Sequence, residues 1–294
     1  PEVRQEILDY CLEIEWFDTH LGRMLAMLEA AGELDNTLVI VTADNGMPFP
    51  RSKANCYEYG IHMPLAVRWG GAAPGGRVID DLVGFVDLTA TIVEAAGAKP
   101  PTDFPMSGRS LMELLKSSKQ GVVDPSRDAA WAARERHTSA RYNNWSYPQR
   151  ALRTAQYLYI RNFESDRWPM GDPREIKADG SLGPEDGAYY DMDMGETRTF
   201  MLSRRNDPSV ARFFQLAVAK RPADELFDII KDPGCLNNLA TNPAFDQTRQ
   251  DLARRMTQFL EKTGDPRALG KGEIWESYPR YSNIRGFPPP DTLK

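Results

Sequence analysis

The sequence has 294 residues, of which 41% are hydrophobic and 27% are charged, as in an ordinary globular protein. Its net charge of −6 at pH 7 argues against a general nucleic-acid binder. No run of about 18 apolar residues occurs, so the sequence encodes no membrane-spanning helix. Cys11, Cys56 and Cys235 lie far apart without Cys-x-x-Cys spacing, which disfavours a zinc knuckle or a dense disulfide framework and leaves one disulfide plus a free thiol open.

The first part of the chain alternates between helical and strand-like patterns. Apolar residues recur every three or four positions from Arg4 to about Ala31, which predicts a long amphipathic helix with one buried face. Thr37 to Thr42 lacks polar alternation, as expected for a parallel strand covered on both faces. A second short strand at 63–69 and helices at 87–96 and 110–115 follow. This order of elements indicates an α/β domain.

A polar stretch, residues 116–126, marks the predicted boundary between a domain at 1–122 and a second one at 123–294. The second domain is expected to be a smaller α+β subdomain with an antiparallel sheet. The elements predicted in it are a half-exposed strand at 150–162, a surface insertion at 164–208, a short strand at 226–229, an amphipathic helix at 245–262 and a wrapping tail after Gly264.

The strand at 37–42 ends in Asp44-Asn45-Gly46, and Pro48-Phe49-Pro50-Arg51-Ser52-Lys53 follows closely. A carboxylate and an amide carbonyl are oxygen ligands that suit Ca²⁺ or Mg²⁺ better than zinc. Lys53 would then neutralise an anion held by the metal. Taken alone, the triplet Asp-Asn-Gly favours a turn, so neighbouring motifs have to decide between the two interpretations.

Several ordered blocks provide that context. The run Leu38–Gly60, followed by Ile61-His62-Met63-Pro64-Leu65, resembles the sulfatase family of the alkaline-phosphatase-like superfamily. The variant Asp-Asn-Gly-Met-Pro-Phe-Pro is most similar to its heparan N-sulfatase (sulfamidase) branch. Three further blocks match in order: Trp16-Phe17-Asp18-Thr19-His20-Leu21-Gly22-Arg23, Tyr147-Pro148-Gln149-Arg150-Ala151-Leu152-Arg153-Thr154 and Asp224-Glu225-Leu226-Phe227-Asp228 with Lys231-Asp232-Pro233 and Asn238-Leu239-Ala240. The resemblance spans roughly residues 5–262 and implies an alkaline-phosphatase-like, mostly parallel sheet flanked by helices in the first domain.

The resemblance also implies roles for particular residues. Asp44 and Asn45 would be two ligands of a single Ca²⁺, and Lys53 would contact the sulfate or the leaving-group oxygen. His137 falls where related enzymes place a substrate-facing histidine, which acts as a general acid or binds sugar substituents. Two arginines would join the substrate site: Arg51 and Arg141.

The expected nucleophile is missing from the sequence. In this family it is a formylglycine made from the first residue of a Cys/Ser-x-Pro-x-Arg motif, and none of the three cysteines begins one. Ser146-Tyr147-Pro148-Gln149-Arg150 fits the pattern, but it follows the metal-ligand strand, so we interpret it as a decoy. We therefore expect the C-terminal part of a sulfatase, inactive by itself, whose formylglycine lies upstream in the N-terminal portion of the same enzyme.

Two alternatives stay open. A phosphoryl or phosphodiester hydrolase of the same superfamily usually needs two transition metals with several histidine ligands, and the chain has only three histidines. A non-catalytic carbohydrate-binding pseudo-enzyme would keep the fold for recognition alone. The expected partner is a sulfated carbohydrate of unassigned identity, with neither nucleic acid nor a membrane span involved. The resemblance points to a periplasmic, secreted or lysosomal location and leaves room for a homo-oligomer.

Overall fold

The computed structural model describes residues 1–100, 102–103 and 105–292, which form two compact units. Unit 1 comprises residues 1–6, 45–63 and 132–294, and unit 2 comprises residues 7–44 and 64–131. The predicted domain boundary after residue 122 stays a prediction, while the units divide at 131/132 and place the segment after Asp44 with the C-terminal residues. No helix of the described residues is both long and apolar enough to cross a bilayer.

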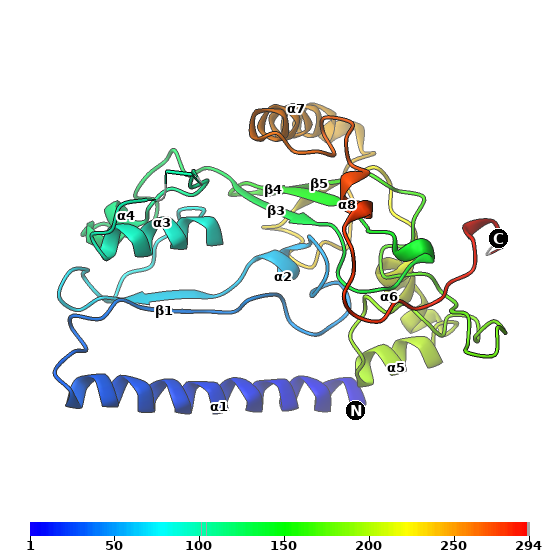
Figure 1. Cartoon of the computed structure of the whole chain (residues 1–294), viewed down its shortest axis with the longest axis horizontal. Coiled ribbons are helices and arrows are strands. Elements are labelled where there is room, and N and C mark those ends of the chain that lie inside the picture. Colours follow the sequence, from blue (N-terminus) through cyan, green and yellow to red (C-terminus); the bar gives the residue numbers. More distant parts are fainter. Residues whose placement is uncertain (101, 104, 293–294) are drawn as a thin grey trace. The chain divides into compact units, whose positions relative to one another are not determined.

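Unit 2 holds most of α1 (Glu2–Ala30) together with β1 (Val39–Thr42), β2 (Leu65–Arg68), α3 (Phe85–Ala95) and α4 (Met112–Lys116) (Figure 1). Its core is built from Leu111, Met112, Leu114 and Leu115 of the α4 region, against which Trp69 and other partly buried side chains pack. The apolar run at 37–42 does form a strand. However, its strand partner among the described residues is β2, and the pair is antiparallel, from Val39 opposite Arg68 to Thr42 opposite Leu65.

The predicted long N-terminal helix is confirmed as α1, but the predicted burial of its apolar face is wrong for the part of the chain that the structure describes. No residue of α1 is buried, and large apolar side chains such as Leu12, Trp16 and Met27 are 60–73% exposed. Periodicity fixes which side chains share a face of a helix, whereas their burial also requires a covering surface.

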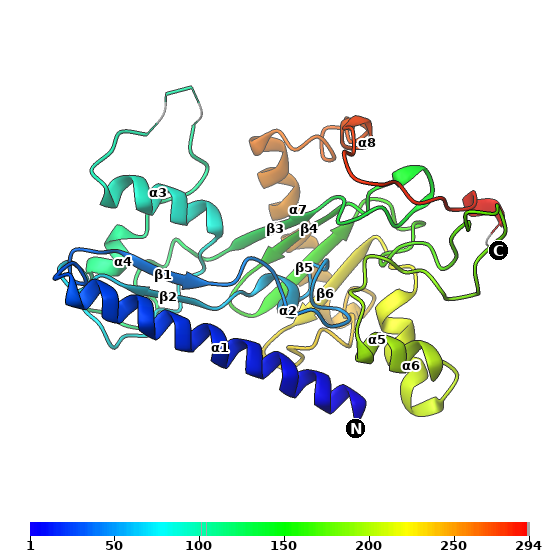
Figure 2. The ribbon, with the colours of Figure 1, turned by 60° about the horizontal axis from the view of Figure 1, so that its bottom comes forward.

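Unit 1 is organised around a four-stranded sheet with the strand order β3-β4-β5-β6. Its strands are β3 (Ala130–Arg134), β4 (Gln149–Arg153), β5 (Tyr157–Asn162) and β6 (Asp224–Asp228). The β4/β5 and β5/β6 pairs are antiparallel, as predicted for the second domain. Helix α7 (Asp246–Thr263) packs on β4 and β5, and it lies across one face of the sheet in Figures 1 and 2. Three residues spaced four apart, Leu252, Met256 and Leu260, are its buried positions.

Two predictions for the second half are corrected. The stretch 150–162 is a hairpin of β4 and β5 rather than one strand, because Thr154 turns the chain: its backbone N–H donates to the Tyr157 carbonyl and its Oγ1 accepts from the Tyr157 N–H. The stretch 164–208 is also more than a surface insertion. It carries α5 (Glu196–Ser203), and its Met170, Tyr189 and Met192 are buried in a core with α6 (Pro208–Val218).

The remaining elements are short. They are α2 (Glu58–Ile61), α8 (Ile274–Ser277) and the 3₁₀ turns η1 (Tyr142–Asn144), η2 (Pro243–Phe245) and η3 (Pro290–Thr292). None of the three cysteines forms a disulfide.

Candidate active site

The candidate anion-binding lysine, Lys53, lies in the segment between β1 and α2 that belongs to unit 1. Its backbone N–H donates to the Met47 carbonyl at 3.0 Å, which folds the Pro-rich loop back on itself. Gly46 allows the loop to lie close to the backbone of Tyr59, because a Cβ at this position would lie 2.4 Å from the Tyr59 carbonyl oxygen. The Lys53 Nζ pairs with Asp193 Oδ2 at 2.9 Å, and both side chains keep about a quarter to a third of their surface exposed.

The second candidate, His137, follows β3 and is also partly exposed, at 32% of its side chain. Its Nδ1 lies 3.5 Å from Asp191 Oδ1, within ion-pair range. The same carboxylate oxygen accepts from the Thr138 backbone N–H at 3.0 Å. One buried carboxylate thereby holds both the histidine ring and the backbone that carries it.

Asp191 is charged although its side chain is fully buried. Its Oδ2 receives Arg134 Nη2 at 2.6 Å and Arg141 Nη2 at 2.7 Å. Burial alone would raise the pKa of Asp191, but the guanidiniums of Arg141 and Arg134, together with His137, outweigh burial and hold the pKa well below its usual range. Burial likewise lowers the pKa of Arg134 to about 10, so this arginine stays protonated at neutral pH.

Asp191 and Asp193 bring the two candidate residues together. They are separated by one residue, Met192, and two residues of chain span at most about 7 Å between Cα atoms. One carboxylate holds His137 and the other holds Lys53. Neither carboxylate is predicted from the sequence, because both fall in the stretch 164–208, which reads as a surface insertion. The only available signal was their alternation with methionine in Asp191-Met192-Asp193-Met194, where Met192 is buried and the carboxylates point to partners.

The predicted calcium ligands, Asp44 and Asn45, follow β1 and are both exposed. The Asp44 carboxylate makes no hydrogen bond or ion pair with any residue that the structure describes. The Asn45 Nδ2 donates to the Gly46 carbonyl at 3.1 Å, which leaves the amide oxygen of Asn45 for a cation. The donor set therefore fits a hard cation, but it supplies two of the six to eight oxygens that Ca²⁺ takes. No cluster of three or more His, Cys, Asp or Glu side chains suited to a metal occurs among the described residues.

Neither predicted substrate arginine faces solvent freely. Arg141 is fully buried, and its guanidinium donates to the Trp168 and Pro169 carbonyls besides Asp191. Arg51 donates to the Leu216 carbonyl at 2.6 Å and the Cys235 carbonyl at 2.5 Å. It also stacks on the Tyr57 ring at 3.9 Å. In this structure both guanidiniums are hydrogen-bonded to backbone carbonyls. Direct contact of either arginine with substrate stays a prediction.

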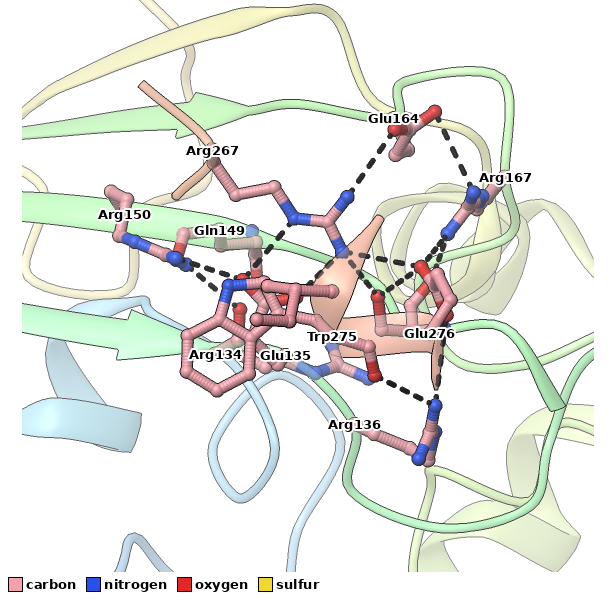
Figure 3. Close-up of polar contacts among 12 residues, drawn as sticks. Arg134, Glu135, Arg136, Gln149, Arg150, Glu164, Arg167, Arg267, Trp275 and Glu276 are labelled. Carbon is pink, nitrogen blue, oxygen red and sulfur yellow. Dashed lines mark hydrogen bonds and ion pairs between the residues drawn. The ribbon is translucent and has the colours of Figure 1, made fainter. Parts of the chain in front are cut away.

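The decoy motif has a structural role. Ser146 is fully buried, donates through Oγ to Glu276 Oε1 at 2.7 Å and accepts from Arg267 Nη2 at 2.9 Å. Three arginines, Arg136, Arg167 and Arg267, surround Glu276 in the same network (Figure 3). Although burial works against it, bonding to Arg167 and Ser146 lowers the pKa of Glu276 to about 2. A hydroxyl enclosed in this way is not presented to a substrate.

Comparison with known proteins agrees with these motifs. A family model described as Sulfatase matches residues 2–98, and a second one, described as N-sulphoglucosamine sulphohydrolase, C-terminal, matches residues 51–179. The chain therefore resembles the sulfatase family over the residues that these two models match. Among the relatives of this chain is an ulvan-active sulfatase of Formosa agariphila, 25% identical over 87% of this chain and 38% of that protein. Another is the human N-sulphoglucosamine sulphohydrolase, 26% identical over 90% of this chain and 50% of that protein.

A solved structure shares the fold. It is described as a complex with its substrate D-glucosamine-2-N,6-O-disulfate, and it matches with a TM-score of 0.58 at 21% identity, over 85% of this chain and 40% of that one. This likeness confirms the predicted alkaline-phosphatase-like fold class. The chain thus spans half or less of the length of these relatives.

Proposed function

We propose that this chain is part of a sulfatase that hydrolyses sulfate ester or sulfamate groups on a sulfated sugar. The observation that carries the proposal is the placement of Lys53 and His137 on two carboxylates, Asp193 and Asp191, that stand one residue apart. A cation and an ionisable ring gathered in this way, both partly exposed, suit a reaction in which negative charge develops on a leaving oxygen. The relatives named above favour a sulfated glucosamine or a sulfated polysaccharide as substrate.

The pairing of Lys53 with Asp193 lets the lysine exchange partners. Partly exposed ion pairs contribute only about 0–1 kcal/mol, so a sulfate oxygen competes readily with Asp193 for the ammonium. The lysine would then hold the sulfate group or its bridging oxygen, as the resemblance implies. Asp193 keeps the ammonium oriented before the substrate binds.

His137 is oriented for proton transfer. Its Nδ1 faces Asp191, and its other ring nitrogen, Nε2, makes no hydrogen bond with the described residues. A carboxylate beside Nδ1 favours a ring that carries a proton on that atom. In the imidazolium form, Nε2 donates a proton to the leaving-group oxygen, which is the role of a general acid.

Two groups outside the described atoms complete the proposal. Asp44 and Asn45 would hold one Ca²⁺, which supplies positive charge to the sulfate oxygens. A formylglycine upstream of this chain would supply the nucleophile. By the same resemblance we place the enzyme in the periplasm, outside the cell or in the lysosome.

The test is sulfate release by the full-length protein from glucosamine N-sulfate and glucosamine 6-O-sulfate. We expect Lys53→Ala to lower kcat/KM by about a hundredfold, the loss of one charged contact of about 3 kcal/mol. The matched control is Lys262→Ala on α7, an exposed lysine with no assigned role. An unchanged rate for Lys53→Ala would refute the role given to that lysine.

Metal content separates the alternatives. One calcium per molecule that is lost in the double variant Asp44→Ala/Asn45→Ala supports the assigned ligands. Two zinc ions without calcium, together with phosphate release from phosphate esters, would instead favour the phosphoryl hydrolase. A full-length protein whose only Cys/Ser-x-Pro-x-Arg match is the decoy at Ser146 and that releases no sulfate would favour the pseudo-enzyme.

A further inference from the structure

The backbone is in an unusual conformation on both sides of Lys53. Arg51 and Ala54 have positive φ angles of 69° and 59°, which lie in the left-handed region that residues with a Cβ rarely adopt. Such conformations persist only where the surrounding structure holds them, and they are frequent at functional sites. Contacts from other parts of unit 1 therefore have to hold the turn at residues 51–54.

The start of this turn is anchored by the side chain of Arg51. Its guanidinium donates to the carbonyls of Leu216 and Cys235 and stacks on the Tyr57 ring. These contacts fix the chain before Lys53 but leave the carbonyl of the lysine to be held from elsewhere.

The end of the turn is fixed by Asn55, which is buried. Its Nδ2 donates to the Lys53 carbonyl at 2.9 Å, and its Oδ1 accepts from Arg221 Nη2 at 2.6 Å. A guanidinium only donates and a carbonyl only accepts, so an amide between them satisfies both and can take only this orientation. Because the Lys53 N–H donates to the Met47 carbonyl at 3.0 Å, both backbone polar groups of the lysine are held.

Arg221, in the segment between α6 and β6, gives Asn55 a fixed partner. It is buried, and its guanidinium carbon lies 4.7 Å from the centroid of the Tyr57 ring and 5.8 Å from that of Tyr147. The buried carboxylate of Glu225, which accepts from the Tyr57 hydroxyl at 2.8 Å, lies close enough to stabilise the positive charge. Asn55 is the hydrogen-bond acceptor of this guanidinium among the described residues, where Arg221 Nε and Nη1 have none.

We propose that Asn55 and Arg221 are positioning residues for the proposed reaction: through the Lys53 carbonyl, they hold the turn in the conformation that places the Lys53 ammonium. The inference rests on the proposed function, which gives the lysine its contact with the sulfate. Both residues are buried and act through Lys53 rather than by touching the substrate.

This arrangement fixes a flexible side chain at both ends. A lysine carries its charge on a four-carbon stem with many rotamers, and a small misplacement of a group that contacts the reacting atoms lowers the rate strongly. Asp193 orients the ammonium, whereas Asn55 and Arg221 fix the backbone from which the stem extends. Only the ammonium then has to exchange partners when the substrate binds.

The test uses Asn55→Asp in the full-length protein. The carboxylate keeps the shape and the acceptor for Arg221, but it has no N–H for the Lys53 carbonyl and places an oxygen against it. We expect kcat/KM for sulfate release to fall by about tenfold, the effect of losing one hydrogen bond. Asn237→Asp is the matched control, because Asn237 Oδ1 also accepts from an arginine, Arg212, at 3.2 Å but is exposed; its rate should stay as in wild type.

A second background separates positioning from a general loss of structure. In Lys53→Ala, the added Asn55→Asp substitution should change kcat/KM by less than about twofold, because the asparagine acts through the lysine. Arg221→Met, which removes the donor to Asn55, should show the same dependence on Lys53. Hydrogen exchange at the Lys53 amide should become about tenfold faster in Asn55→Asp and stay unchanged in Asn237→Asp.

Three results would overturn the inference: Asn55→Asp as active as wild type, a tenfold loss that persists in the Lys53→Ala background, or unchanged exchange at the Lys53 amide. If Arg221→Met fails to fold, Asn55→Asp still decides, because it keeps the contact with Arg221. Failure of the proposed function looks different. In that case wild type releases no sulfate from either glucosamine sulfate, while the Lys53 amide still exchanges faster in Asn55→Asp.

Discussion

The buried carboxylate of Asp191 offers the sharpest test of the site's construction. Its Oδ2 receives two guanidinium contacts at 2.6 and 2.7 Å, and its Oδ1 receives the Thr138 N–H at 3.0 Å. Asp191→Asn keeps the shape but removes the charge. The introduced amide also has to point its NH₂ group at donors, either the two guanidiniums or the Thr138 N–H.

The expected cost follows from burial. Removing one partner of a buried ion pair leaves uncompensated charge, here on Arg134 and Arg141, and costs about 3–5 kcal/mol. Asp193→Asn is a matched control two residues away. Its side-chain partner among the described residues is Lys53, the pair is partly exposed, and such pairs contribute about 0–1 kcal/mol. Urea unfolding followed by circular dichroism should therefore separate the two variants by at least about 2 kcal/mol.

The pH dependence checks the cause. The folded-state pKa of Asp191 lies below its ordinary value of 3.8, so its stabilisation is present above that pH and is lost as the pH falls toward the folded pKa. The deficit of Asp191→Asn should accordingly shrink in acid. If Asp191→Asn and Asp193→Asn lost equal unfolding free energy at pH 7, burial would not explain the contribution of Asp191 to stability.

Three further outcomes are expected. Burial raises the pKa of Asp172 to about 6, which disfavours the charged form in the fold; the contribution of Asp172 to stability should therefore fall by about 2 kcal/mol as the pH rises from 4 to 7, and thermal melts of Asp172→Asn should show a higher Tm than wild type at pH 8 but not at pH 4. Glu276→Gln removes the carboxylate that binds three arginines and should lower the urea-unfolding free energy by about 2 kcal/mol; a loss below 0.5 kcal/mol would contradict the described network. Gly46→Ala would press a Cβ against the Tyr59 carbonyl and should lower the urea-unfolding free energy by about 1–3 kcal/mol. The control, Gly22→Ala, has open space around it in α1 and should raise that free energy by about 0.5–1 kcal/mol.

Long periodic elements were predictable from the sequence. The predicted helix at 245–262 is α7 at Asp246–Thr263, and the one from Arg4 to Ala31 is α1 at Glu2–Ala30. A repeat of three and four sustained over many residues has few competing interpretations. The pattern says which side is apolar but not what covers it, so burial was predicted correctly for α7 and wrongly for α1 within the described residues.

Short elements were harder to predict, because a few hydrogen bonds decide them. The hairpin of β4 and β5 depends on the turn made by the hydroxyl and backbone of Thr154, and a threonine inside an alternating run is also typical of a continuous strand. In 164–208 the many Asp, Gly and Pro residues indicate loops, and the segment is indeed mostly irregular. Its scattered methionines and tyrosines nevertheless enter a core cluster, which composition does not reveal.

The ion pairs of the candidate site also could not be predicted from local sequence patterns. Lys53 and His137 could be named from the sequence, because the residues around them match family motifs. The carboxylate partner of Lys53 lies 140 positions away in the sequence, and that of His137 lies 54 positions away. No local spacing connects such pairs. The fold alone places Asp191 beside His137 and Asp193 beside Lys53.

The fold gives Arg141 a buried partner that the sequence does not show. From the sequence, Arg141 is predicted to bind the substrate together with His137, which lies four residues before it. In the structure, both side chains instead share one carboxylate, Asp191, whose charge is compensated by Arg141 and Arg134. Burial penalises a lone carboxylate, so the two arginines at Oδ2 compensate the charge of Asp191, while His137 lies at Oδ1. Arg141→Lys would keep the positive charge but lose the guanidinium fork that also donates to the Trp168 and Pro169 carbonyls. A lysine could replace an arginine that only supplies charge to the substrate. It could not replace one that makes these carbonyl contacts as well as the ion pair with Asp191.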